Sequence, residues 1–168
     1  MEHVLSPIVL SKIEDQIDRI DHLVALLPAG QLDWTPPIPG AFSVSVLLGH
    51  LMESTSGFCA VLYAARPDRL GHFVELKKLS GNSRIGPSEA RVRLGMYRDH
   101  IREGFALLAD EDLGRKIPTV FVPEGESILS LLLVNSEHLA SHKYQLFMYL
   151  RLLGVNVASK DLYHFSGQ

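Results

Sequence analysis

Apolar residues recur along most of this chain with the three- and four-residue spacing of amphipathic helices. Four stretches carry this pattern, at residues 6–27, 43–66, 88–108 and 127–154. The apolar seam of the first stretch is Val9, Ile13, Ile17, Ile20, Val24 and Leu27. The seam of the third is Leu94, Tyr97, Ile101, Phe105 and Leu108. The pattern predicts four helices that bury their apolar faces against one another.

A serine stands at the start of each predicted helix, where its hydroxyl can accept a hydrogen bond from a free backbone N–H. These serines are Ser6, Ser43, Ser88 and Ser127. Gly154 stands where a glycine commonly ends a helix, and it closes the fourth. The sequence therefore predicts N-caps at these serines and a C-cap at Gly154.

The three connections between the helices are longer than the tight loops of a simple up-and-down bundle. Pro28-Ala-Gly ends the first helix, and Leu32–Gly40 is a proline-rich crossover that cannot be helical. Residues 67–87 form a loop with a short helical piece around Val74–Leu79. Residues 117–122 are extended and predict one arm of a small hairpin. We expect one all-α domain over residues 1–168, a four-helix bundle with long crossover connections in which at least one pair of successive helices runs parallel.

Polar side chains interrupt the seam of the fourth helix at mid-length. That seam reads Ile128, Leu131, Asn135, His138, His142, Gln145, Tyr149 and Leu152. Burying an unpaired polar group costs about 1–3 kcal/mol, so the four middle residues, the polar stripe, need partners. His138 and His142 are four residues apart, which places both imidazoles on one face within reach of one metal ion.

The second helix carries a matching interruption at His50 and Glu53. If the second and fourth helices pack in one core, His50 meets His138 and His142. Three imidazoles and an open position are the ligand set of a catalytic zinc-type site. Four neighbours are candidates to accept hydrogen bonds from these imidazoles: Glu53, Asn135, Glu137 and Gln145. Glu53 is also a candidate general base. A buried polar network without metal is the alternative interpretation.

Three further features carry weaker predictions. His100 lies at the edge of the third seam, close enough to be a minor candidate for the site. Cys59 is nine residues from His50, on the opposite side of the same helix, and is expected to be a small buried hydrophobe. The acidic run Glu14, Asp15, Asp18 and Asp21 lies off the first seam and is expected to be a solvated face.

Composition excludes several classes of protein. A chain of 168 residues with 46% hydrophobic and 21% charged residues is typical of a soluble globular protein. The net charge of −3 gives no basic surface for nucleic acid, and charges break every apolar run before the 18 residues of a membrane span. A single cysteine fits the reducing cytoplasm. There is no phosphate-binding glycine loop or serine nucleophile elbow.

Three motifs, in this order and spacing, make the chain resemble the DinB/YfiT-like superfamily of small bacterial four-helix-bundle metalloproteins. They are Leu32-Asp-Trp34 with the crossover, Ser43-Val-x-x-Leu47-Leu-Gly-His50-Leu, and His138-x-x-x-His142-x-x-Gln145-x-x-x-Tyr149-Leu-Arg151. The tail Val157–Tyr163 also resembles the family's ending. The resemblance implies a metal triad of His50, His138 and His142, zinc or nickel as the metal, and a homodimer.

Characterised relatives in that superfamily include transferases and isomerases that use low-molecular-weight thiols such as bacillithiol or mycothiol. The resemblance therefore implies a cytoplasmic metal-dependent enzyme acting on a small molecule, first a thiol-dependent transferase and second a metal-dependent hydrolase. The competing hypothesis is a non-catalytic metal- or small-ligand-binding bundle of a stress response. Neither hypothesis includes a nucleic-acid or membrane partner.

Overall fold

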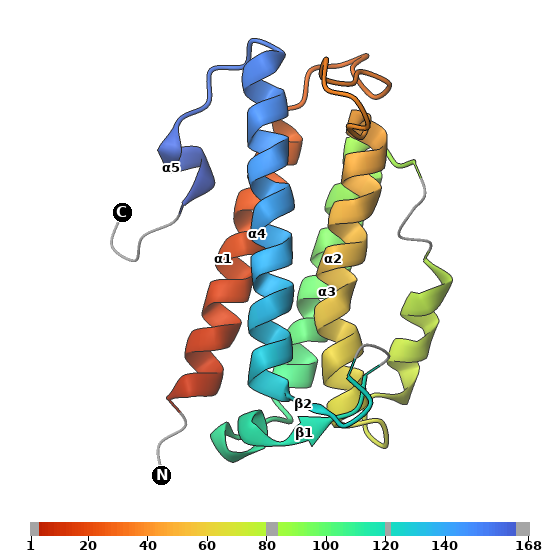
Figure 1. Cartoon of the computed structure of the whole chain (residues 1–168), viewed down its shortest axis with the longest axis vertical. Helices are drawn as coiled ribbons and strands as arrows, with labels where there is room; N and C mark the ends of the chain where they lie inside the picture. The colour runs from red at the N-terminus through yellow and green to blue at the C-terminus, as the bar shows by residue number, and fades with distance from the viewer. Residues whose placement is uncertain (1–3, 80–83, 120–121, 164–168) are drawn as a thin grey trace.

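The computed structural model describes residues 4–79, 84–119 and 122–163 and consists mainly of helices (Figure 1). The long ones are α1 (Leu5–Ala25), α2 (Val44–Ala65), α3 (Pro87–Phe105) and α4 (Ile128–Leu152). Short 3-10 helices, η1 (Gly71–Lys78) and η2 (Asp110–Gly114), lie in the connections, and α5 (Ser159–Leu162) follows α4. The strands β1 (Lys116–Ile117) and β2 (Glu126–Ser127) pair antiparallel, so the small hairpin before α4 is confirmed.

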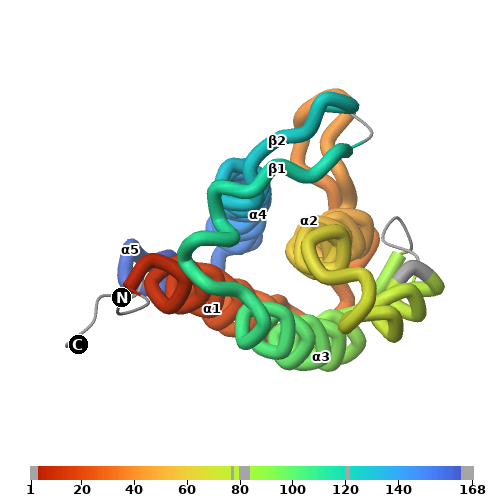
Figure 2. The backbone as a smooth tube through the Cα atoms, turned by 90° about the horizontal axis from the view of Figure 1, so that it is seen from below, coloured from red at the N-terminus to blue at the C-terminus, as the bar shows by residue number. Residues whose placement is uncertain are grey.

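The four long helices form a bundle in which α1 and α2 occupy opposite corners. Each of these two helices packs against both α3 and α4, as the view along the bundle shows (Figure 2). The helices α2 and α3 run in the same direction, because the segment containing η1 returns the chain to the other end of the bundle before α3 begins (Figure 1). The predicted bundle with a parallel pair of successive helices is therefore confirmed.

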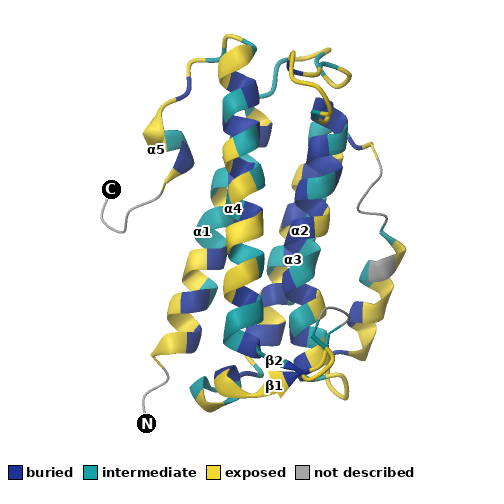
Figure 3. Cartoon of the chain, in the orientation of Figure 1, coloured by how far each residue is buried: buried dark blue, intermediate teal, exposed yellow. Residues whose placement is uncertain are grey.

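The core is built by apolar residues from all four helices (Figure 3). In α1 the predicted seam is buried from Val9 to Val24, and in α3 it is buried from Leu94 to Phe105. The helix α2 is long and apolar enough to span a membrane, but most of its apolar window is packed inside the bundle. Burial of this kind is typical of a helix in the core of a bundle.

The predicted seam of α4 is displaced from the face that the bundle buries, and in α2 the predicted core positions His50 and Glu53 are likewise not buried. In α4 the buried face contains Ile128, Leu132, Leu139, Leu146 and Leu150, whereas His138 and Leu152 are exposed. Both helices are apolar around much of their surface, so more than one seam fits the spacing. The polar stripe consequently lies along the edge of the contact between α2 and α4. We had expected it in the centre of the core.

Two of the four predicted serine caps are confirmed. Ser43 accepts the Val46 N–H at 3.4 Å, and Ser127 accepts the Ser130 N–H at 3.1 Å. Gly154, with φ +81°, follows the end of α4 as predicted.

The predicted caps at Ser6 and Ser88 are wrong. Ser6 lies inside α1, whose first backbone N–H groups, from Val4 to Ser6, donate to the carboxylate of Asp110 at 2.8–3.0 Å. A carboxylate from a distant segment can replace a hydroxyl cap because its full charge interacts with the helix dipole. Ser88 is the second residue of α3, and Gly86 occupies the N-cap without a side-chain bond.

The acidic side of α1 is an ion-pair seam and not a purely solvated face. Three of its carboxylates pair with arginines of α3: Glu14 with Arg102, Asp18 with Arg98, and Asp21 with Arg91. Each arginine lies 70 to 88 residues further along the chain. Spacing within one helix gives no information about such partners, so the sequence pattern could not reveal the pairing.

Gly57 on α2 allows α4 to approach closely, and its replacement tests that contact. A Cβ at Gly57 would lie 3.0 Å from Asn135 Cγ and closer still to Oδ1. We expect Gly57→Ala to lower the free energy of unfolding by about 1–3 kcal/mol through this overlap. Gly95→Ala, in α3 with nothing within 4 Å of the added carbon, should raise it by about 0.5–1 kcal/mol. Urea denaturation of both variants measures the difference, and equal stabilities would contradict the close contact.

Candidate metal centre

The structure brings His50, in the second turn of α2, together with His138 and His142, near the middle of α4. One nitrogen from each imidazole lies within 4.8 Å of the corresponding atoms of the other two. The ring centroids are 4.4 Å apart for His50 and His142, 4.7 Å for His138 and His142, and 5.4 Å for His50 and His138. Three imidazoles in this arrangement could hold a metal ion.

A chain of hydrogen bonds that ends at a backbone carbonyl determines which ring nitrogen of His142 carries the proton. Tyr149 donates its hydroxyl to the carbonyl of Phe42 at 2.9 Å, because a carbonyl can only accept. The Tyr149 oxygen therefore accepts from Gln145 Nε2 at 3.1 Å, which turns Gln145 Oε1 toward His142. His142 Nδ1 donates to that oxygen at 3.0 Å, so Nε2 keeps its lone pair.

His50 is oriented in the same way by Glu53. Its Nδ1 lies 3.1 Å from Glu53 Oε2, and a carboxylate only accepts, so His50 Nδ1 carries a proton and, in the neutral imidazole that binds metal, Nε2 keeps its lone pair. The Glu53 side chain is 45% exposed, and that of His50 is 24% exposed. Glu53 thus orients the partly exposed imidazole of His50. The sequence had predicted Glu53 as a candidate acceptor for such a bond.

The two histidines of α4 face each other through Nε2 atoms 3.0 Å apart. His142 Nε2 carries no proton, so this short separation requires either the proton of His138 Nε2 or a cation between two lone pairs. A divalent ion with nitrogen ligands at about 2.0–2.1 Å suits such converging lone pairs. The donor set fits a metal ion.

Burial around His142 favours its neutral form. Desolvation lowers the pKa of His142 below its usual value, and the neighbouring charges of His50 and His138 act in the same direction. The hydrogen bond with Gln145 opposes this shift but does not cancel it. An imidazole must be neutral to bind a metal, so the environment prepares this side chain as a ligand.

The other predicted residues lie around the imidazoles in different ways. Asn135 contacts none of them: its Nδ2 donates to the Ser54 carbonyl at 2.9 Å and joins α4 to α2. Glu137 is exposed, and its carboxylate forms no hydrogen bond or ion pair within the described segments. Only Gln145 and Glu53, of the four predicted acceptors, bond to an imidazole.

Cys59 and His100 lie apart from the three imidazoles. Burial raises the pKa of the Cys59 thiol to about 12, and its sulfur points to the Tyr97 carbonyl of α3. His100 donates to Met96 of its own helix and packs against Phe73 of η1. The prediction that Cys59 is a buried hydrophobe agrees with this position, and His100 belongs to a separate cluster.

An apolar pocket of about 520 Å³ lies beside the imidazoles, between the proline-rich crossover and α4. Its wall includes Pro39, Tyr144 and Met148, and it also contains Gln145 and Tyr149 from the hydrogen-bond chain. A molecule in this pocket would therefore contact the side chains that position His142. Sequence patterns gave no sign of this pocket, because the crossover and α4 are about a hundred residues apart.

The fold and the site together define the class of protein: a small helical bundle with a candidate metal centre, where three imidazoles converge between two of the helices. Comparison with protein families specifies the class: the DinB superfamily matches residues 12–146, and the chain belongs to that superfamily. The resemblance seen in the sequence motifs and the predicted fold are thereby confirmed.

A solved structure supports the same fold. The crystal structure of the DinB-like protein YjoA from Bacillus subtilis is similar, with a TM-score of 0.66 and 19% sequence identity. The alignment covers 95% of this chain and 97% of that one. At this identity the likeness concerns the fold alone. Comparison with curated proteins gives no match.

The lowered pKa of His142 predicts how stability depends on pH. A histidine with a depressed folded-state pKa contributes stability above its unfolded value of about 6.5, and that stability is lost as pH falls toward the folded value. We expect the free energy of unfolding of the metal-free protein to decrease as the pH falls from neutral through about 6.5, the unfolded pKa of histidine. His142→Gln should reduce this decrease in urea titrations. The control His100→Gln should keep it, and an equal effect of both variants would contradict the assignment.

Proposed function

We propose that His50, His138 and His142 bind one divalent metal ion, zinc or nickel, through their Nε2 atoms. The convergence of these lone pairs carries the proposal, since the partners of Nδ1 leave Nε2 free on both His50 and His142. Imidazole nitrogen suits zinc, nickel, copper and cobalt, so the ligands alone do not select one of them. Zinc and nickel follow from the family resemblance.

Three protein ligands leave at least one coordination position open to water or substrate. When bound there, the ion would lower the pKa of a water or thiol and so supply a nucleophile near neutral pH. The chain contributes the surroundings: the bonds from Gln145 to Phe42 hold His142, and Glu53 holds His50 with one side of its carboxylate exposed to solvent. That exposed carboxylate is our candidate general base.

An enzyme acting on a small molecule accounts for the position of this centre. His138 is exposed, so a small molecule can reach the imidazoles from solvent. The adjacent apolar pocket of about 520 Å³ has the size of ordinary ligand sites, which span about 300–1,000 Å³. Accessibility favours a catalytic centre over the non-catalytic metal- or small-ligand-binding bundle.

We infer a low-molecular-weight-thiol-dependent transferase as the best class. In this reaction the thiolate attacks an electrophile held in the apolar pocket, a carbon–sulfur bond forms, and the leaving group departs with the electron pair. Metal-dependent hydrolysis, with water in place of the thiol, is the second class. We propose that the protein works in the cytoplasm as a homodimer.

Metal content tests the triad directly. We expect about one equivalent of zinc or nickel in the reconstituted wild-type protein, and less than a few tenths in His138→Ala, because two imidazoles bind a divalent ion far more weakly than three. Elemental analysis after dialysis measures the ratio. His100→Ala removes a histidine outside the centre and should keep the wild-type content. A wild-type protein that retains no metal, or a His138→Ala variant that retains all of it, would refute the centre.

Conjugation of bacillithiol with monochlorobimane tests the proposed chemistry. We expect the metal-loaded protein to accelerate loss of chloride and formation of the fluorescent thioether. His142→Ala should abolish that acceleration while circular dichroism shows an intact helical fold. Glu53→Gln keeps an acceptor for His50 but loses the base, so it should bind metal and react about 10²-fold more slowly. A metal-loaded wild-type protein without acceleration would favour the non-catalytic bundle.

A further inference from the structure

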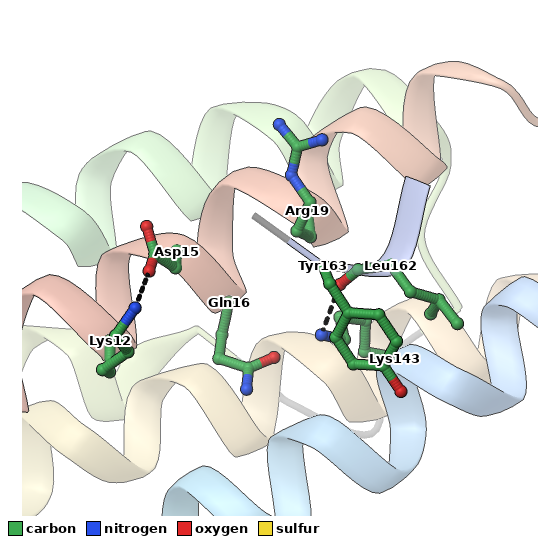
Figure 4. A pocket seen from close by; sticks show the side chains of 7 residues that line it. All are labelled: Lys12, Asp15, Gln16, Arg19, Lys143, Leu162 and Tyr163. Atoms are coloured by element: carbon green, nitrogen blue, oxygen red, sulfur yellow. Dashed lines mark hydrogen bonds and ion pairs between the residues drawn. The ribbon is translucent and has the colours of Figure 1, made fainter. Parts of the chain in front are cut away.

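A second pocket, lined mainly by polar side chains, lies between α1 and α4, and none of the three imidazoles lines it. Figure 4 shows its lining residues. It has a volume of about 150 Å³ and is bounded by α1, α4 and the segment that follows α5. The residues on α1 are spaced as one helical face, and Lys143 comes from α4. The lining residues are Lys12, Asp15, Gln16, Arg19, Lys143, Leu162 and Tyr163.

Lys143 is almost fully buried in this pocket, with 5% of its surface exposed. Its ammonium donates to the Leu162 carbonyl at 2.8 Å and lies 5.4 Å from the centre of the Tyr163 ring. In the described part of the chain, no carboxylate lies within ion-pair distance of it. Lysine is rarely buried without an opposite charge, because desolvation of the ammonium is costly.

Arg19 adds a second cation without an acceptor. Its buried Nε has no hydrogen-bond partner, and across residues 4–79, 84–119 and 122–163 its guanidinium forms no ion pair. The nearby carboxylate, Asp15, is already bonded to Lys12 at 2.8 Å. Arginines on α3 contrast with this arrangement, since Arg91, Arg98 and Arg102 all pair with carboxylates of α1.

Gln16 also has a buried polar atom, Oε1, without a hydrogen-bond partner among the described residues. Three buried side-chain atoms lack a partner among the described residues, and two of them, Gln16 Oε1 and Arg19 Nε, belong to this pocket. A half-turn of the Gln16 amide exchanges its oxygen and nitrogen without moving any other atom, so it can present donors to the pocket. The pocket can thus offer donors from this amide and from Lys143, and Arg19 lies on its wall with the guanidinium turned away from Lys143 (Figure 4).

The charge of the pocket identifies the class of ligand. Three cations and one carboxylate line it, in a chain whose net charge is −3. Water could satisfy the free N–H groups but would leave the buried ammonium of Lys143 without an opposite charge in contact with it. The volume is well below the 300–1,000 Å³ or so of sites for larger ligands, so the occupant is small.

We propose that this pocket binds a small oxyanion, a phosphate or the carboxylate of a small molecule, through Lys143, with the positive charge of Arg19 on its wall adding to the attraction. The segment around α5 holds one wall in place, since His22 of α1 bonds to Asp161 at 2.8 Å. The proposal is independent of the metal centre, because it uses none of the three imidazoles or the residues that orient them.

Calorimetric titration of the full chain tests the proposal, with inorganic phosphate in one arm and acetate in the other, at constant ionic strength in chloride. We expect saturable binding of at least one anion, and the arm that binds identifies the phosphate or carboxylate class. Lys143→Met, which keeps the length and removes the charge, should abolish it. Arg19→Gln should weaken it several-fold to roughly tenfold, because a positive charge on the pocket wall is lost.

Two controls separate this site from other sources of binding. Lys78→Met removes an exposed charge on η1 and should bind the anion like wild type. His138→Ala removes a proposed metal ligand and should also bind it, so failure of the metal centre leaves this result unchanged. If Lys143→Met does not fold, Arg19→Gln decides alone. Absence of saturable binding in both arms, or wild-type affinity in the variants at Lys143 and Arg19, overturns the proposal.

Discussion

The close contact between α2 and α4 is the constraint on which the imidazole centre depends. Gly57 provides the space for this contact, and Asn135 fills it while bonding to the Ser54 carbonyl. Ser54 lies one helical turn from His50, and Asn135 lies about one turn before His138. The hydrogen bond from the Asn135 side chain to the Ser54 carbonyl therefore fixes both the separation and the axial register of α2 and α4 immediately beside the three imidazoles. A slip of one turn would move His50 by about 5.4 Å and separate it from its partners.

The crossover between α1 and α2 supplies the second constraint, the direction of the hydrogen bonds. A backbone carbonyl can only accept, so Phe42 determines the direction of every bond that runs through Tyr149 and Gln145 to His142. Trp34 packs edge-on against Tyr149, with ring centroids 5.4 Å apart, and restricts the ring that carries this hydroxyl. The crossover thus has a chemical role that its proline-rich composition did not reveal.

Spacing within single helices predicted those parts of the structure that local geometry determines. The four helices, the caps at Ser43 and Ser127 and the grouping of the three histidines all follow from residues on one face of one helix, combined with packing of two such faces. Features that depend on which helices become neighbours were missed: the Asp110 cap of α1, the arginines of α3, and the pocket around Lys143. The exact buried face of α4 was also wrong, because a helix that is apolar on several sides leaves its rotation to the packing of the whole bundle.

Two adjacent residues of α4 lie in different electrostatic environments, one facing α2 and the other facing α1. His142 and Lys143 are consecutive in the sequence, and their side chains project about 100° apart around the helix. His142 therefore faces His50 of α2, whereas Lys143 faces α1 in the pocket that Arg19 also lines. On the α2 side, neutral imidazoles present lone pairs that attract a cation. On the α1 side, a buried ammonium stands beside an unpaired arginine, and an apolar residue of similar length would pack there with less loss of solvation. Among the described residues, the carboxylate of α1 that lines this pocket is Asp15, and it pairs with Lys12, so the proposed anion would supply Lys143 with the opposite charge that a buried ammonium requires.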